Sequence, residues 1–162
     1  MKKNLLLIVF SLVFALLDQL TKLYAIGAWK DCMPVEVIEG FFNFCYVENR
    51  GAAWGMFQGR QIPLLVFSLF ALVWILWKIR PAYIRMRGGT ICLALLIGGI
   101  IGNSYDRLFR TGVVDFLDFH WWDKYHFPAF NVADSCICVG VALMCILQYL
   151  ADRRKEETTS SK

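Results

Sequence analysis

Four long apolar segments dominate this 162-residue sequence and restrict what it can fold into. Apolar residues make up 58% of the chain, and they form uninterrupted runs instead of the spaced pattern of a soluble helix or strand. A helix crosses the hydrocarbon core of a bilayer with about 20 apolar residues. The runs therefore predict membrane spans at about 5–28, 63–80, 88–105 and 132–150. The second and third runs are short, so we expect them to use flanking residues or a thinner bilayer.

The placement of basic residues predicts the orientation in the membrane. The formal net charge of +4 is modest, but Lys and Arg gather before the first span, between the second and third, and after the fourth. Segments rich in Lys and Arg stay on the cytoplasmic side. We therefore expect both termini in the cytoplasm. The start of the chain resembles a signal peptide, but its apolar run is long and no small-x-small cleavage site follows, which favours an uncleaved first span.

The segments between the spans predict one membrane domain over residues 1–151, with outer loops at about 29–62 and 106–131. In the first loop, Val35–Ile38 and Phe42–Glu48 read as two strands that pair across Glu39 and Gly40. The predicted fold class is thus an all-α integral membrane protein with four transmembrane helices and a small extracytoplasmic β-sheet between helices 1 and 2. The second loop reads as an interfacial loop with aromatic residues. Residues 152–162 form a polar cytoplasmic tail that we expect to be disordered.

Three strongly polar residues lie inside the predicted spans at one depth. Counting 1.5 Å per residue, Asp18 lies about 20 Å from the cytoplasmic end of its span, Asn103 about 21 Å and Asp134 about 24 Å. Ionisable residues inside a membrane are costly and indicate function by default. Their common depth, in the outer leaflet, predicts a single site. Gly98 and Gly102 have the small-xxx-small spacing of close helix packing, just before Asn103.

Each of these polar residues also has a structural interpretation. Asp18 and Lys22 are four residues apart and can form an ion pair on one helix face. Asn131 is a suitable N-cap, which makes Asp134 a first-turn acid favoured by the helix dipole. Asn103, Asp106 and Arg107 can form a polar network between helix ends.

Asp115 is harder to explain as a solvated acid, because bulky apolar residues flank it in Val113–Leu117. Asp118 is the competing choice in the same loop. The outer loops also hold Trp54, Met56 and Phe57, which are suited to the membrane interface. Cys32 and Cys45 both face outward and can pair, although their spacing does not show that they do.

Several function classes receive no support from the residues. There is no basic patch interleaved with aromatic residues, so nucleic-acid binding is not expected. His120 and His126 are the only histidines and form no HExxH motif, and we expect no metal and no cofactor. Ser104 and Ser135 lack a GxSxG context. A proton-coupled transporter and a lipid-binding scaffold stay as alternatives to an enzyme, although the inner half of every span is nearly apolar.

Five segments, taken in order, resemble the bacterial lipoprotein signal peptidases, also called type II signal peptidases. These segments are Asp18–Lys22, Asn49–Gly55, Gly102–Arg107, Val113–Phe116 and Phe130–Ser135. Each is short, but together they extend over all four predicted spans. The resemblance implies an aspartic endopeptidase whose catalytic pair is Asp115 and Asp134. It assigns substrate-binding or site-supporting positions to Asp18, Lys22, Asn49, Gly51, Asn103, Asp106, Arg107, Asn131 and Ala133.

The resemblance also implies the reaction and the partners. The substrate is a prolipoprotein that carries a diacylglyceryl group on a cysteine, and cleavage is on the amino side of that cysteine. Two neighbouring carboxylates share a proton and can activate water between them. The implied location is the bacterial cytoplasmic (inner) membrane, among membrane lipids, with the active site toward the extracytoplasmic side. The cyclic peptide globomycin is the expected inhibitor, and the expected state is a monomer.

Overall fold

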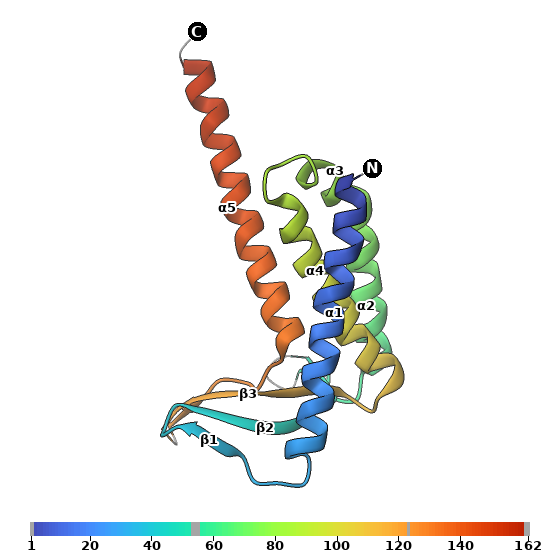
Figure 1. Cartoon of the computed structure of the whole chain (residues 1–162), viewed down its shortest axis with the longest axis vertical. Coiled ribbons are helices and arrows are strands. Elements are labelled where there is room, and N and C mark those ends of the chain that lie inside the picture. The colour runs from blue at the N-terminus through green and yellow to red at the C-terminus, as the bar shows by residue number, and fades with distance from the viewer. Residues whose placement is uncertain (1, 53–55, 123, 161–162) are drawn as a thin grey trace.

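Four helices of this chain are long and apolar enough to cross a membrane, as the sequence predicts. The computed structural model describes residues 2–52, 56–122 and 124–160. The helices stand side by side, and both termini lie at the same end of the bundle (Figure 1). Their bounds are α1 Lys2–Trp29, α2 Gln61–Trp74 with the π-helical turn η2 Ile75–Ile79 and α3 Arg80–Tyr83, α4 Gly89–Phe109, and α5 Val132–Ser160.

The second span is a composite of α2, η2 and α3. Pro81 has no backbone N–H, so it cannot donate to the carbonyl of the residue four positions earlier. The chain widens into a π-helical turn just before it, where the Arg80 N–H donates to the Ile75 carbonyl, five residues back. This turn lets the helix pass the proline, and the span extends to Tyr83.

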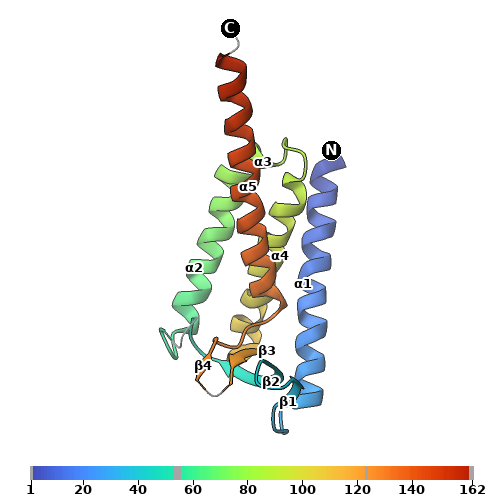
Figure 2. The same cartoon turned by 90° about the vertical axis from the view of Figure 1, so that its left-hand side faces the viewer.

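Helix α4 lies at the centre of the bundle and packs closely against α1 and α5 (Figure 2). Small residues make the close approach possible. A Cβ on Gly98 would lie 2.7 Å from the Phe14 Cβ, and one on Gly99 would lie 2.5 Å from the Ala133 carbonyl oxygen. Glycine on two faces of α4 thus brings the backbones of α1, α4 and α5 together. The small-xxx-small spacing of Gly98 and Gly102 predicts close helix packing, and the partner there is α1, where Cβ atoms on these glycines would meet Phe14 and Asp18.

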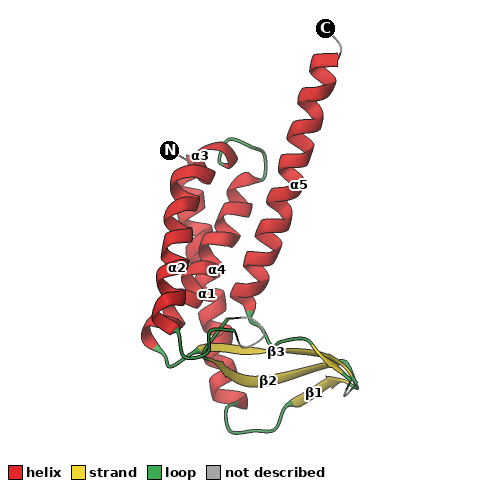
Figure 3. Cartoon of the chain, turned by 180° about the vertical axis from the view of Figure 1, so that it is seen from behind, coloured by secondary structure: helices red, strands yellow, loops and turns green. Residues whose placement is uncertain are grey.

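A four-stranded antiparallel sheet lies across the end of the bundle opposite the termini (Figures 1 and 3). Its strands, in spatial order, are β1 Val35–Ile38, β2 Phe42–Asn49, β3 Val113–Trp121 and β4 Tyr125–His126. The predicted pairing of the first two strands is confirmed. The second outer loop, which we interpret from the sequence as an interfacial loop with aromatic residues, contains strand β3. Its Val, Phe and Leu residues are strand formers, and its backbone groups find partners on β2.

The sheet is attached to α1 by aromatic packing. The ring of Trp29, at the end of α1, stacks on Phe44 of β2 with ring centroids 4.6 Å apart. Val114 and Phe116 of β3 are buried against Ala25 of α1 in the same cluster. Strand β3 therefore has one face toward α1, and its opposite face carries Asp115.

The polar tail differs from the prediction. Helix α5 continues without interruption to Ser160, whereas we expected disorder from Asp152 onward. Ala, Arg, Lys and Glu dominate residues 151–157 and are strong helix formers. A side-chain hydrogen bond of 2.9 Å from Gln148 to Asp152 supports the first of these turns. The polarity of the tail thus does not predict its conformation, because its residues favour a helix.

The two outer cysteines are both free thiols. Cys32 is exposed, whereas Cys45 is buried in β2. Burial raises the pKa of the Cys45 thiol to about 12, so this group stays protonated near neutral pH. Trp54 lies outside the described residues, whereas Met56 and Phe57 are both exposed.

The glycine contacts predict how the bundle responds to one added methyl group. Gly98→Ala forces the new Cβ against α1 and should destabilise the protein by about 1–3 kcal/mol. Gly27→Ala is the matched control, because no atom lies within 4 Å of its Cβ position. We expect a lower thermal unfolding midpoint in detergent for Gly98→Ala and an equal or higher one for Gly27→Ala. Equal midpoints for the two variants would contradict the close packing of α1 on α4.

Candidate active site

A cavity of about 470 Å³ lies where the sheet meets the helices. Its wall combines the end of β2, the last turns of α4, strand β3, the segment before α5, and the first turns of α5. It brings together residues that are more than 80 positions apart in the sequence. The lining residues are Asn49, Gly51, Ala52, Asn103, Arg107, Val113, Asp115, Phe127, Pro128, Ala129, Phe130, Asp134, Ser135 and Cys138.

Asp115 enters the cavity from β3 and is almost completely buried, at 2% exposure. Its two carboxylate oxygens accept hydrogen bonds from neutral amides, namely Asn131 Nδ2 at 2.7 Å and Asn49 Nδ2 at 2.9 Å. Asn49 ends β2, which pairs with β3. The pairing of β2 with β3 thus positions both Asp115 and Asn49, one of its two hydrogen-bond donors.

Asp134 enters the cavity from the first turn of α5. Its backbone N–H donates to Asn131 Oδ1 at 3.0 Å, and the Asn131 N–H donates to Asp134 Oδ2 at 3.2 Å. This reciprocal pair is a capping box, so the N-cap interpretation is confirmed. The other oxygen of Asp134 accepts a hydrogen bond of 2.7 Å from Asn103 Nδ2. Capping accounts for one oxygen only, and Asp134 still lines the cavity.

Asn131 connects the two acids directly. Its side-chain amide donates to Asp115 while its backbone N–H donates to Asp134. Its amide also donates to Asn103 Oδ1 at 3.2 Å. Because Asn131 is fully buried, this one residue sets the relative position of both carboxylates.

The environment of Asp115 favours its protonated form. Burial, followed by the negative charge of Asp134, raises the pKa of the Asp115 carboxyl from its ordinary 3.8 to about 7. The hydrogen bonds from Asn49 and Asn131 lower this pKa, but they do not balance the cost of burial. Near neutral pH this carboxyl is therefore able to hold or release a proton.

A buried ion cluster lies next to the cavity and contacts it through Asn103, which lines the cavity. Lys22 Nζ lies 2.8 Å from Asp18 Oδ2, 2.9 Å from Asp106 Oδ2 and 2.8 Å from Asn103 Oδ1. The predicted Asp18–Lys22 pair is thus present, but Asp106 is a second counter-ion. Asp18 Oδ1 also accepts the backbone N–H of Ala133 at 2.8 Å, which ties α1 to the start of α5.

The remaining predicted residues occupy distinct positions. The Gly51 N–H donates to Asn49 Oδ1 at 2.9 Å, and a Cβ there would lie 2.5 Å from the Met56 carbonyl oxygen. Arg107 lines the cavity, and its guanidinium donates a long hydrogen bond of 3.4 Å to the Asn103 carbonyl oxygen. Ala133 contributes its buried backbone amide.

Asp118 does not line this cavity. Successive side chains of a strand point to opposite faces, so β3 directs Asp115 and Asp118 away from each other. Asp118 instead lies 3.4 Å from Asn43 Nδ2 and 3.9 Å from His126 Nδ1, beside a different pocket. Of the two acids that compete in this loop, only Asp115 reaches Asn131 and the cavity.

Two residues of the cluster were not predicted as site residues. Gln19 Nε2 donates to Asp18, to Asp106 and to the Gly102 carbonyl, at 3.1 to 3.2 Å. Arg110 pairs with Asp106 one helical turn away. The i, i+4 spacing of Asp106 and Arg110 is a signal that could have found the second residue. Within the described ranges, no three His, Cys, Asp or Glu side chains come together in a way that could hold a metal ion.

Comparison with known proteins gives the family. Residues 10–150 match the sequence model of the family described as signal peptidase (SPase) II. The chain belongs to the signal peptidase II family. It is 40% identical over 144 residues to a lipoprotein signal peptidase of Clostridium acetobutylicum, covering 87% of this chain and 92% of that protein. It is also 40% identical over 149 residues to one of Syntrophotalea carbinolica, covering 90% and 91%.

The fold agrees with this family. A solved bacterial membrane enzyme is similar with a TM-score of 0.70 and 34% identity, over 91% of this chain and 88% of that one. A second one gives a TM-score of 0.67 and 32% identity, over 86% and 90%. Membership of the family makes the chain a membrane peptidase, and it decides against the transporter and scaffold alternatives.

The raised pKa of Asp115 predicts a pH dependence of stability. A carboxyl whose folded-state pKa exceeds its unfolded value binds more protons when folded, so its stabilising contribution is present below about 3.8 and is lost as pH rises through about 7. Asp115→Asn cannot ionise and should lack this component. We expect the thermal unfolding midpoint of the variant, relative to that of the wild type, to rise between about pH 4 and pH 7. Parallel pH profiles for the two proteins would contradict the assignment.

Proposed function

We propose that this chain is an aspartic endopeptidase that removes signal peptides from diacylglyceryl-modified prolipoproteins, on the amino side of the lipidated cysteine. The observation that carries the proposal is the pair of acids, Asp115 and Asp134, bridged by Asn131 at one cavity. The names of the similar proteins, lipoprotein signal peptidases, support the substrate class.

The proposed reaction needs no covalent intermediate. At neutral pH the pair holds one proton, because two nearby carboxylates in a low-dielectric site do not both ionise easily. The ionised member accepts a proton from water as the water oxygen attacks the scissile carbonyl. The protonated member donates a hydrogen bond to the carbonyl oxygen. When the C–N bond breaks, a proton passes to the leaving amine, and the pair again holds one proton.

The neighbours of the pair suit this chemistry. In the described part of the chain, the hydrogen bonds to the carboxylates of Asp115 and Asp134 come from neutral amides. The donors are the side chains of Asn49, Asn103 and Asn131 and the backbone of Asn131. A directly bonded cation would hold both acids ionised, whereas amides orient them and leave a shared proton in place. We propose that Arg107, which lines the cavity, contacts the substrate backbone.

The cavity also suits a substrate anchored in lipid. Val113, Phe127, Pro128, Phe130 and Cys138 line it beside the two acids. Asp134 lies in the first turn of a membrane-spanning helix, so the site is near one boundary of the bilayer. A diacylglyceryl group in the membrane would hold its cysteine at this level, which brings the bond before that cysteine to the acids.

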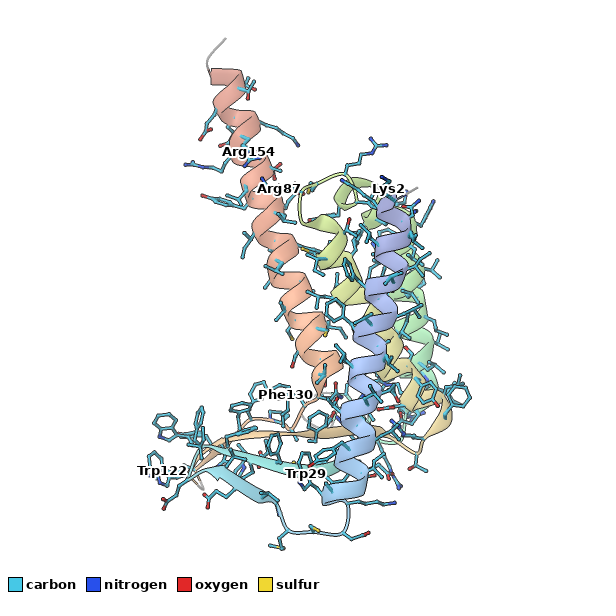
Figure 4. All side chains as sticks on the ribbon, in the orientation of Figure 1. Lys2, Trp29, Arg87, Trp122, Phe130 and Arg154 are labelled. Atoms are coloured by element: carbon cyan, nitrogen blue, oxygen red, sulfur yellow. The ribbon has the colours of Figure 1, made fainter. Side chains whose placement is uncertain are left out.

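We further propose the orientation expected from the sequence. Lys2, Arg87 and Arg154 lie at one end of the bundle, whereas Trp29, Trp122 and Phe130 lie at the other (Figure 4). The positive-inside rule assigns the basic end, with both termini, to the cytoplasm, and the cavity then faces the extracytoplasmic side of the bacterial inner membrane. The proposed active form is a monomer, since one chain supplies both acids, and globomycin is expected to bind in the same cavity.

The test of the pair is cleavage by the purified full chain. A diacylglyceryl-modified precursor is added in detergent or vesicles, and the product is identified by mass. Asp115→Asn and Asp134→Asn should each lower the rate by about 100-fold or more, because each removes a proton-transferring group. Asp118→Asn is the matched control on the opposite face of β3 and should cleave at the wild-type rate. Full activity in either of the first two variants would remove that residue from the pair.

The test of the lipid anchor uses the same precursor without its diacylglyceryl group. We expect the wild-type chain to cleave it far more slowly, because nothing then holds the scissile bond at the depth of the acids. Product masses from both precursors are compared at equal concentration. Equal rates would overturn the proposed role of the lipid while leaving the two acids as the catalytic pair.

A further inference from the structure

A second groove lies at the other end of the bundle, between α1, the composite second span and α4. Its volume is about 340 Å³, which is within the range of ligand sites in proteins. The walls are apolar, and the polar residues Asn4 and Arg80 also line it. The apolar lining includes Leu7, Ile8, Leu12, Leu72, Leu76 and Ile97. None of these residues belongs to the cavity that holds the two acids.

The groove lies in a region of unbalanced positive charge. Residues 1–17 and 60–105 contain no Asp or Glu. The basic residues in the first turn of α1 and from η2 to α4 are Lys2, Lys3, Lys78, Arg80, Arg85 and Arg87. The acids at this end belong to the last turns of α5, which also carry Arg153, Arg154 and Lys155. Figure 4 shows Lys2 and Arg87 at this end.

Arg80 and Lys3 keep their positive charges unneutralised. Arg80 is half-buried, and its guanidinium donates to the neutral Asn4 Oδ1 at 2.9 Å. Lys3 Nζ donates to the carbonyl oxygens of Ile84 and Arg85, at 3.0 and 3.3 Å. In the described part of the chain neither cation has a carboxylate within ion-pair distance. A guanidinium has five N–H donors, so most of those on Arg80 remain available for an anion.

We propose that this groove binds one anionic phospholipid. An acyl chain lies along the apolar walls, and the phosphate group contacts Arg80 and Lys3. Basic pockets between helix ends, next to the headgroup level, are suited to anionic lipid headgroups. A zwitterionic lipid also carries a positive charge in its headgroup, which would lie near Arg80 and Lys3, so its binding free energy should be less favourable. The signal peptide of a substrate is a poorer occupant, because its positively charged first segment would meet these cations.

Lipid binding in this groove is separate from peptide cleavage, and it does not depend on the proposed catalytic pair. The groove is joined to the active site only through the body of α1 and α4, so the lipid has no part in the chemistry. It fills the gap between α1 and the second span, both of which rest on α4. We expect it to stabilise the bundle by binding the folded state only.

The experiment is a lipid titration of the purified full chain, followed by native mass spectrometry. Phosphatidylglycerol and phosphatidylcholine with the same acyl chains are compared, and glycerol phosphate tests the headgroup without chains. We expect one phosphatidylglycerol to bind in preference to phosphatidylcholine, and no binding of glycerol phosphate. Arg80→Gln should weaken phosphatidylglycerol binding about fivefold. Arg87→Gln, which removes an equal charge from the same end but outside the groove, should leave binding nearly unchanged.

A second pair of variants tests the apolar walls with all charges kept. Leu12→Trp fills the groove and should abolish binding, whereas Leu5→Trp places the same side chain on α1 outside it. Cleavage activity checks that each variant is folded, and Lys3→Gln replaces Arg80→Gln if that variant is inactive. Equal binding of the two lipids would overturn the proposal, as would equal losses for Arg80→Gln and Arg87→Gln. Binding of glycerol phosphate, or retention of the lipid by Leu12→Trp, would also overturn it.

Discussion

The ammonium group of Lys22 is completely buried, and the arrangement of the other elements depends on how its charge is neutralised. Asp18 of the same helix and Asp106 of α4 both contact it, and Asn103 accepts its third hydrogen bond. A buried charge that loses its partner costs about 3–5 kcal/mol. Asp18 also binds the Ala133 amide, and Asp106 binds the Val114 amide. Neutralising one lysine therefore holds α1, α4, α5 and β3 at a common point.

This cluster separates the acids of the protein into two kinds. Asp18 and Asp106 are bonded to a cation and fixed as structural anions. Asp115 and Asp134 are not bonded to Lys22, and their hydrogen-bond partners are amides. Asn103 connects the two kinds of acid, because its side-chain oxygen accepts a hydrogen bond from Lys22 while its side-chain nitrogen donates one to Asp134. Asn103 therefore fixes Asp134 relative to the buried cation. Burial raises the pKa of the Asp115 carboxyl, whereas the charge of Lys22 lowers this pKa without a direct bond to the carboxyl.

Much of this arrangement was predictable from particular residues. The apolar runs predict four spans, the glycines of α4 predict close packing, and Val35–Ile38 with Phe42–Glu48 predicts a strand pair. The common depth of Asp18, Asn103 and Asp134 predicts that they lie together. A series of contacts connects them, because Lys22 bonds Asp18 and Asn103, and Asn103 bonds Asp134. The errors lie where local composition is ambiguous. Strand β3 reads as an aromatic loop until β2 provides its partner, and the polar tail reads as disordered although its residues favour a helix.

The sequence by itself determined the number of membrane-spanning helices and, through five short segments, indicated the family. It did so because membrane spans and helix caps are local properties of consecutive residues. Only the tertiary structure decided which acid of β3 reaches the cavity, that Asp106 is the second partner of Lys22, and that Asn131 bridges Asp115 and Asp134. Those facts depend on strand register and on contacts between separate elements, such as Lys22 with Asp106 and Asn131 with Asp115, which no local pattern encodes.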